Sequence, residues 1–257
     1  MNVLASLVNE LATGSVQVVD LTHTLSPDFP VMILPPEFGQ CARFRVEEVS
    51  RYDERGPAWY WRNFSCGEHT GTHFDAPVHW ISGKDQPNAT VDSIPVDGFV
   101  RPVCVIDCSA QCAENEDFLL TVDQIQDWET VHGPIPAGAW VLMRSDWSKR
   151  SGADYLNLRD DGPHSPGPSA EAIQYLVDQR DIVGFGSETV GTDAGQGAHL
   201  TPPYPAHYLL HGAGRYGLQC LSGLDRLPAT GAVLICPPLK IEAGSGSPTR
   251  VLALVDK

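Results

Sequence analysis

The segment His69-Thr-Gly-Thr-His-Phe-Asp-Ala-Pro-Val-His-Trp80 concentrates metal-binding residue types within a chain of 257 residues. Three of the nine histidines of the chain fall within eleven positions here. A helix is opposed by the glycine and the proline of the segment. A straight strand would separate His69 from His73 by about 13 Å, which is too far for one ion. We therefore predict a turn over residues 70–72 and an extended segment over 73–75.

The side chains of this segment form a suitable ligand set for a divalent cation. Two or three imidazoles and one carboxylate suit Zn²⁺, Mn²⁺ or Fe²⁺. In an extended backbone the side chains of His73 and Asp75 point to the same side, with Cα atoms about 7 Å apart. Gly71 gives the backbone the freedom to fold His69 back toward them. The alternative is a strand with surface histidines and a structural Asp-Ala-Pro turn, and it leaves the concentration of ligands unexplained.

Outside this segment the sequence predicts many strands and few helices. Four helices are expected. One covers residues 1–14, a second begins at the capping box of Thr121, a third begins near Ser169, and a fourth covers residues 206–211. This pattern favours one α/β domain over residues 1–257, with a mixed, barrel-like sheet. The apolar stripe of the first helix can pack on its own core or on a partner subunit. The predicted strands cover residues 16–21, 42–49, 58–64, 100–107, 139–145, 181–186, 232–236 and 251–255.

Composition excludes several classes of protein. The chain has 17 Lys+Arg against 32 Asp+Glu, a net charge of −15, which argues against nucleic acid or an anionic membrane as the main partner. No apolar run approaches the ~18 residues of a membrane span. The start lacks the features of a secretory signal, so a cytoplasmic protein is expected. Seven cysteines without CxxC spacing oppose a disulfide framework, and we expect Cys104 and Cys108 in the core.

The string His-Thr-Gly-Thr-His-Phe-Asp-Ala-Pro-Val-His over residues 69–79 resembles the HxGTHxDxPxH signature of the cyclase family of metal-dependent hydrolases. That family includes bacterial kynurenine formamidase and isatin hydrolase. Residues 20–25, 181–190 and 207–228 are similar to further segments of the family, so the resemblance extends over most of the chain. It implies the swivelling β/β/α fold of that family and a homodimer or higher oligomer.

The resemblance also implies roles for individual residues. His69, His73 and Asp75 would bind a divalent ion, and His79 would be the general base toward a water that the ion activates. With two neutral imidazoles and one carboxylate, the ion keeps a net charge of +1 and polarises bound water strongly. The expected reaction is hydrolysis of a cyclic amide, in the first place isatin to isatinate.

One position departs from the family pattern. His207 matches a second-site histidine, and twelve residues further on the family has a metal-binding Glu, where this chain has Gln219. An amide carries no charge and is a poorer ligand, so one ion is expected, with Mn²⁺ favoured and Zn²⁺ possible. Gln219 could bind that ion through its carbonyl oxygen or hold a substrate oxygen. A glutamine here is similar to the isatin hydrolase branch, and kynurenine formamidase activity is the alternative.

Aromatic residues near the motif are candidates for binding a planar aromatic lactam or amide. Trp59 and Trp61 share a face of a predicted strand, and Trp80 directly follows the expected base. Trp59 and Trp80 are therefore predicted to contact substrate, together with His207 and Gln219. The alternative for the tryptophan pair is ordinary core packing.

Other features receive less specific interpretations. Residues 212–217 match GxGxxG by letter but follow a helix-like segment, which opposes a dinucleotide site. Residues 244–248 are predicted to be a mobile loop.

Two rival functions remain open. His73, Asp75 and His207 also match an Fe(II) facial triad, so an oxygenase is one rival, and a non-enzymatic metal-binding protein is the other. Of the other histidines, His164 and His199 are candidates to approach the substrate. His23 is expected to have a structural role. His132 and His211 are expected to be surface or core residues.

Overall fold

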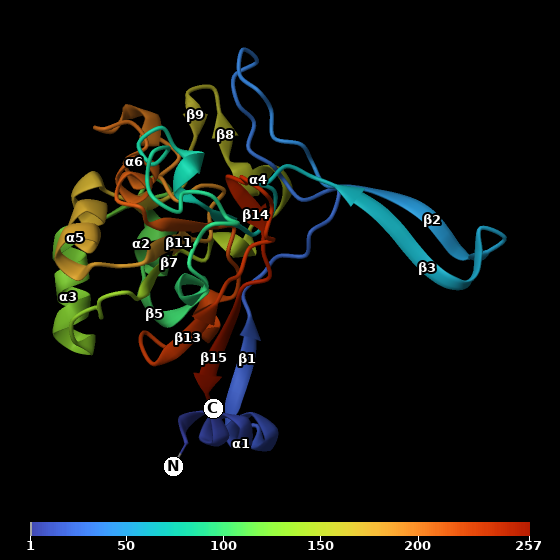
Figure 1. Ribbon diagram of the computed structural model, residues 1–257. Coiled ribbons are helices and arrows are strands. Elements are labelled where there is room, and N and C mark those ends of the chain that lie inside the picture. Colours follow the sequence, from blue (N-terminus) through green and yellow to red (C-terminus); the bar gives the residue numbers. More distant parts are fainter. Residues whose placement is uncertain (1) are drawn as a thin grey trace.

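The computed structural model describes residues 2–257 (Figure 1). Its main sheet has nine strands: β1 (Val16–Asp20), β4 (His73–Asp75), β5 (Val100–Asp107), β7 (Trp140–Arg144), β11 (Gly184–Ser187), β12 (Tyr216–Gln219), β13 (Ala232–Ile235), β14 (Gly246–Pro248) and β15 (Leu252–Asp256). Their order is β1-β15-β13-β5-β7-β11-β12-β4-β14. The four strands β5, β7, β11 and β12 are parallel, and the strands on both sides of them are antiparallel. The curled, mixed sheet confirms the predicted fold class.

The helices are α1 (Val3–Thr13), α2 (Ser109–Glu114), α3 (Val122–His132), α4 (Gly152–Leu156), α5 (Ala170–Arg180) and α6 (Pro205–Gly212). α3, α5 and α6 lie together against one face of the sheet (Figure 1). Local sequence explains where they begin. Thr121 and Gln124 form the predicted capping box of α3, and the Ser169 side chain accepts a hydrogen bond from the Ala172 N–H at the start of α5.

The sheet separates two hydrophobic cores, because successive residues of each strand point to opposite faces. On β5, Val103 and Val105 face one core, while Cys104 and Ile106 face the core beneath the helices. Cys108 is buried in the same helix-covered core, which confirms the packing role predicted for Cys104 and Cys108. Both faces of the central parallel strands are therefore covered, as is usual for parallel sheets.

Three two-stranded sheets complete the chain. β6 (Leu119–Leu120) pairs with β10 (Gly167–Pro168), and β8 (Leu158–Arg159) pairs with β9 (Gly162–Pro163). β2 (Arg45–Asp53) and β3 (Gly56–Ser65) form a long antiparallel hairpin that projects away from the rest of the molecule (Figure 1). We call this hairpin, residues 45–65, the arm.

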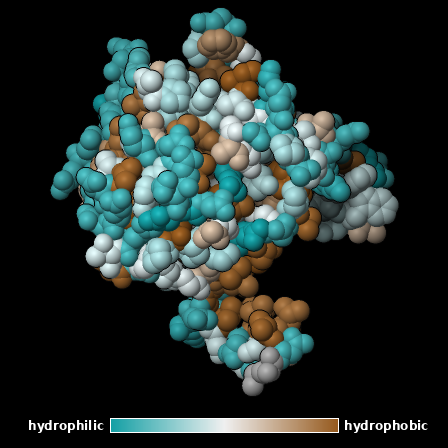
Figure 2. Space-filling view, turned by 60° about the vertical axis from the view of Figure 1, so that its left-hand side comes forward, coloured by the Kyte–Doolittle hydropathy of each residue, from teal (hydrophilic) through white to brown (hydrophobic). Residues whose placement is uncertain are grey.

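Helix α1 is well formed but buries none of its residues in this chain. The Asn2 side chain caps its first turn, and Gly14, with φ +77°, ends it as the sequence predicts. Its apolar surface is visible as a brown area at the end of the molecule in Figure 2 and includes Val3, Leu4 and Val8. Among residues 2–257, no helix has the length and apolar character needed to cross a membrane.

Candidate metal centre and active site

Strand β4 carries the two central residues of the motif and is held on both sides. It pairs antiparallel with β12, so that His73 lies opposite Gln219 and Asp75 opposite Gly217, and with β14 on its other edge. The turn before it uses Gly71 in the left-handed region, with φ +70°. The predicted turn and extended segment are thus confirmed. A side chain at Gly217 would begin 3.1 Å from Asp75 Oδ2, so this glycine leaves room for the carboxylate.

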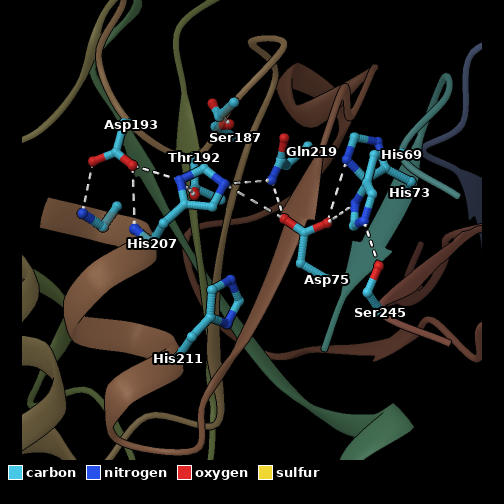
Figure 3. Close-up of polar contacts among 12 residues, drawn as sticks. His69, His73, Asp75, Ser187, Thr192, Asp193, His207, His211, Gln219 and Ser245 are labelled. Atoms are coloured by element: carbon cyan, nitrogen blue, oxygen red, sulfur yellow. Dashed lines mark hydrogen bonds and ion pairs between the residues drawn. The ribbon is translucent and has the colours of Figure 1, made fainter. Parts of the chain in front are cut away.

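Asp75 lies at the centre of the histidine cluster (Figure 3). Its Oδ1 is 2.7 Å from Nδ1 of His69 and 3.4 Å from Nε2 of His73. Burial alone would raise the pKa of this fully buried carboxyl group, but the imidazoles of His73, His79 and His69 hold it well below its usual value. Within residues 2–257, no Lys or Arg forms an ion pair with Asp75. A buried carboxylate surrounded by imidazoles fits a divalent cation, which supplies the missing positive charge.

Hydrogen bonds fix the orientation of the two candidate histidine ligands. His73 Nδ1 donates to the Gly71 carbonyl oxygen at 2.7 Å, which leaves Nε2 free to bind a cation. His69 Nε2 lies 2.9 Å from Ser245 Oγ, and that hydroxyl donates to Glu68 Oε2 at 2.6 Å. Such outer partners orient metal-binding imidazoles and select their tautomers. Neither Ser245 nor Glu68 was predicted from the sequence.

The region around Ser245 also corrects one prediction. Residues 244–248 were expected to form a mobile loop, but Gly246–Pro248 is strand β14, paired with β4. The Gly246 backbone passes so close to His69 that a Cβ atom would begin 2.5 Å from its Cε1. Small residues in this segment therefore allow close approach to the histidine cluster, and the sequence alone gives no partner strand from which this could be inferred.

His79 lies at the end of a short 3₁₀ turn, Pro77–His79, and stacks on His69 with ring centroids 3.8 Å apart. Burial lowers its pKa to about 2, while the negative charge of Asp75 opposes that shift. The imidazole is therefore neutral at physiological pH and has a lone pair available. Ligand atoms of His69, Asp75 and His79 all lie within 4.8 Å of one another, so His79 directly adjoins the candidate metal centre.

Gln219 and His207 complete the other side of Asp75. The Gln219 amide nitrogen donates to Asp75 Oδ2 and lies 3.2 Å from His207 Nε2. On its far side, His207 Nδ1 donates to Asp193 Oδ2 at 2.5 Å. Asp193 also accepts the backbone N–H groups of Ala206 and His207, so it caps the first turn of α6 while it orients the imidazole (Figure 3). Sequence reasoning did not identify Asp193.

His211 belongs to the same cluster, although the sequence interpretation left it as a surface or core residue. It lies one turn after His207 on α6 and is fully buried. Its Nδ1 donates to the Arg215 carbonyl oxygen at 3.0 Å, and its Nε2 is buried with no hydrogen-bond partner in the described part of the chain. Ligand atoms of Asp75, His207 and His211 lie within 4.8 Å of one another. The i, i+4 spacing of the two histidines was the available signal.

An apolar pocket opens beside His207. Trp80 borders this region, with its ring 4.8 Å from that of His207 and 5.7 Å from that of Tyr204. Trp80 thus lies next to a lining residue of the pocket, and its contact with substrate stays a prediction. Residues that line the pocket include Met32, Ile33, Tyr155, Leu158, Val190, Tyr204 and His207.

Other candidate residues lie outside the cluster. Trp59 is on the arm, with 51% of its surface exposed, and is not brought to the site within one chain. His164 is held in ion pairs by Asp117 and Asp161, and His199 ends a 3₁₀ turn on the 195–204 loop. His23 packs against aromatic rings, as expected for a structural residue. His132 is exposed at the end of α3.

Comparisons with known proteins agree with this geometry. The family model described as "Putative cyclase" matches residues 19–194. The chain is 51% identical to isatin hydrolase of Roseibium aggregatum, over 99% of this chain and 97% of the relative. Kynurenine formamidase of Salinibacter ruber is a more distant relative, 31% identical over 72% of this chain and 74% of its own length.

Solved structures give the same result. Isatin hydrolase A from Labrenzia aggregata, bound to benzyl benzoate, has a TM-score of 0.98 and 71% identity over 99% of both chains. An isatin hydrolase bound to the product analogue thioisatinate has a TM-score of 0.97 and 50% identity, over 99% of this chain and 98% of that one. The matched motif, the shared fold and these identities show that the chain belongs to the cyclase family of metal-dependent hydrolases.

Proposed function

We propose that this protein hydrolyses the lactam of isatin, or of a closely related cyclic amide, to the ring-opened keto acid. The similarity to isatin hydrolases over nearly the whole chain supports this substrate class. The observation that carries the proposal within the family is Gln219, whose amide nitrogen lies between Asp75 Oδ2 and His207 Nε2. A neutral amide is a poorer ligand for a second cation at this place than a carboxylate would be.

We further propose that the site holds one divalent ion, bound by His69, His73 and Asp75, with Mn²⁺ favoured over Zn²⁺. The Gln219 amide nitrogen donates a hydrogen bond to Asp75 Oδ2 and faces His207 Nε2. The amide N–H groups therefore lie where a second cation would otherwise contact Asp75 and His207. When bound, the ion supplies a Lewis acid that makes water more acidic and stabilises negative charge on the amide oxygen.

The chain's own residues then account for proton transfer. His79 is neutral and adjoins the ligand cluster, so it can take a proton from the attacking water. As the C–O bond forms and the ring C–N bond breaks, His79 returns that proton to the leaving nitrogen, which becomes an arylamine. His207 lines the apolar pocket, and the Trp80 ring lies beside both His207 and His79, so the two side chains would hold the planar substrate next to His79.

Quaternary structure is part of the proposal. The family resemblance favours a homodimer, and helix α1 is a candidate contact because none of its residues is buried in one chain.

An absorbance assay of the purified protein with isatin and with N-formylkynurenine tests the proposed reaction. Each substrate is measured before chelation, after chelation, and after addition of Mn²⁺ or Zn²⁺. Isatin turnover that is lost on chelation and restored by Mn²⁺ supports the proposal. Formylkynurenine turnover restored by Zn²⁺, without isatin turnover, would replace it with formamidase activity. Oxygen consumption that requires Fe²⁺ and a co-substrate would indicate an oxygenase instead.

A further inference from the structure

Ser245 connects a carboxylate to one of the candidate metal ligands. Its hydroxyl donates to Glu68 Oε2 at 2.6 Å, and its backbone N–H donates to the same oxygen at 3.2 Å. Its Oγ is also 2.9 Å from His69 Nε2 (Figure 3). Among residues 2–257, Ser245 provides the only hydrogen bonds that the Glu68 carboxylate accepts. The two side chains thus form one connection that ends on His69, and we call it the Glu68–Ser245 link.

The chemistry of the donors and acceptors determines where the protons of this link lie. A carboxylate only accepts hydrogen bonds, and a serine hydroxyl has one proton to donate. Because that proton goes to Glu68, the Ser245 oxygen can only accept from His69. The proton of the neutral His69 imidazole therefore lies on Nε2, and the lone pair of the ring lies on Nδ1.

This Nδ1 lone pair faces the centre of the histidine cluster. The nitrogen is 2.7 Å from Asp75 Oδ1. A lone pair and a carboxylate oxygen are both acceptors, so at this distance they repel each other unless a cation is bound to both. The contact between His69 and Asp75 therefore fits a divalent ion that is bound by Nδ1 of His69.

The two histidine ligands of the motif are held in different ways. His73 Nδ1 donates to the Gly71 carbonyl oxygen only two residues earlier, so its tautomer is fixed inside the motif. His69 depends on Ser245, which lies 176 positions further along the chain. The orientation of one ligand is thus local, whereas that of the other requires a distant segment to pack correctly.

The glycines on both sides of Ser245 make room for this arrangement. A Cβ atom on Gly244 would begin 3.1 Å from Glu68 Oε1, and one on Gly246 would begin 2.5 Å from His69 Cε1. Only a residue without a side chain lets the backbone pass this close at both places. The Gly-Ser-Gly segment therefore brings one hydroxyl between Glu68 and His69.

Backbone hydrogen bonds hold Ser245 next to the ligands. Its carbonyl oxygen accepts the N–H of Ala76 at 2.9 Å, directly after Asp75. The residues that follow form β14, which pairs with β4, the strand that carries His73 and Asp75. The position of the hydroxyl is thus set by the sheet itself, as a preorganised site requires.

We infer that Glu68 and Ser245 are positioning residues that hold His69 in the Nε2–H tautomer, so that Nδ1 binds the divalent ion. This inference rests on the proposed ligand set of His69, His73 and Asp75, and it is independent of the substrate. Outer partners of this kind change metal affinity by ~10–100-fold. Because Glu68 acts through Ser245, the effects of removing the two side chains are not additive.

Isothermal titration of the chelator-treated, dialysed full chain with Mn²⁺ tests the link without any substrate. We expect ~10–100-fold weaker binding for Ser245→Ala and for Glu68→Ala, and no further loss in the double variant. The matched control is Ser109→Ala, which removes a hydroxyl that donates to a carboxylate, Asp107 Oδ1, at 2.6 Å but lies at the start of α2. This control should bind Mn²⁺ like the unmodified protein, and circular dichroism checks that every variant is folded.

Nitrogen-15 NMR of the histidine side chains measures the tautomer in the zinc-loaded protein. We expect His69 to be protonated on Nε2, with Nδ1 bound to zinc. The signals of this ring are assigned by their absence in His69→Ala. In Ser245→Ala the Nε2–H signal of His69 should shift, because the proton loses its acceptor, while the signals of His73 should stay in place.

Two results would overturn the role of the link and leave the ligand set intact. The first is a Ser245→Ala variant that binds Mn²⁺ as tightly as the unmodified protein while His69→Ala binds it weakly. The second is a His69 ring that is protonated on Nδ1 in the zinc-loaded protein. Unchanged Mn²⁺ affinity in His69→Ala would reject the proposed ligand set, and this inference with it. Turnover is not used in these measurements, so failure of the proposed isatin hydrolysis would be seen separately.

Discussion

Gln219 and Asp75 lie on neighbouring antiparallel strands, and the amide nitrogen of Gln219 donates a hydrogen bond to the buried carboxylate of Asp75. The same nitrogen faces His207 Nε2 at 3.2 Å. A neutral donor thus occupies the place between a carboxylate and an imidazole where a cation could otherwise bind. This relationship connects the sequence difference at position 219 to the number of ions in the site.

Gln219→Glu is expected to increase the metal content from one ion toward two per chain. The introduced carboxylate would face Asp75 and His207, and two buried carboxylates in contact repel unless a cation lies between them. Isatin turnover should fall at least ~10-fold, because the second charge alters the electrostatics around the reacting amide. Elemental analysis of the dialysed protein measures the metal content. Gln219→Met, which has a similar size and no amide, is the control and should keep one ion.

A variant that retains one ion per chain would contradict this account of position 219. The number of ions would then be set by His69, His73 and Asp75 alone.

His79→Gln is expected to lower kcat by ~10²–10⁴-fold while leaving the metal content unchanged. The neutral imidazole of His79 adjoins His69 and Asp75, and the proposed function gives it the proton transfer and leaves metal binding to other residues. Steady-state kinetics with isatin and elemental analysis separate the two roles. His132→Gln changes an exposed histidine on α3 and should behave like the unmodified protein. Near-normal turnover would remove the base assignment, and loss of the ion would make His79 a ligand.

His211→Phe is expected to change thermal stability little, because loss of the hydrogen bond to the Arg215 carbonyl oxygen offsets removal of the unpaired Nε2, and to lower kcat/KM by ~10-fold or more. In the folded chain, His211 Nε2 is a buried acceptor without a partner, and such an atom is unfavourable unless a bound molecule supplies the donor. His211 lies beside Asp75 and His207, so a substrate bound in the site would be within reach of this nitrogen. Calorimetry and kinetics on the same preparation test both parts. An unchanged kcat/KM would make His211 a packing residue only.

The sequence was sufficient for features that depend on local chemistry. The turn at Gly71, the capping box of Thr121 and the alternation on β5 all follow from residues close together in the chain. Partners supplied by distant segments could not be predicted. Ser245 reaches His69 from 176 positions away, and Asp193 reaches His207 only because the preceding loop folds over the start of α6. No periodicity in the sequence records such contacts.

The position of Trp59 was beyond sequence reasoning for a related reason. Strand pattern alone shows that Trp59 and Trp61 share a face, but it does not show whether that face turns toward the body or away from it. The structure places both on a projecting hairpin. His211 differs, because its helical spacing from His207 was visible in the sequence and could have placed it in the site.

Outside the site, His164 is expected to make stability depend on pH. Its Nδ1 is 2.7 Å from Asp117 Oδ2 and its Nε2 is 3.0 Å from Asp161 Oδ1. The hydrogen bond to Asp161, followed by that to Asp117, raises the pKa of His164 above its usual value. A raised folded-state pKa means that the stabilisation is complete below the unfolded pKa of about 6.5 and is lost as pH rises through the folded value.

Chemical denaturation of the unmodified protein and of His164→Gln at pH 5.5 and pH 8.5 measures this contribution. The stability difference between the two proteins should be larger at pH 5.5, where the imidazolium bridges both carboxylates, and smaller at pH 8.5. High salt should reduce the difference at pH 5.5, because Asp161 is exposed and its ion pair is screened. A difference that is the same at both pH values would mean that His164 acts through neutral hydrogen bonds. In that case, protonation would not help to hold Asp117 and Asp161 together.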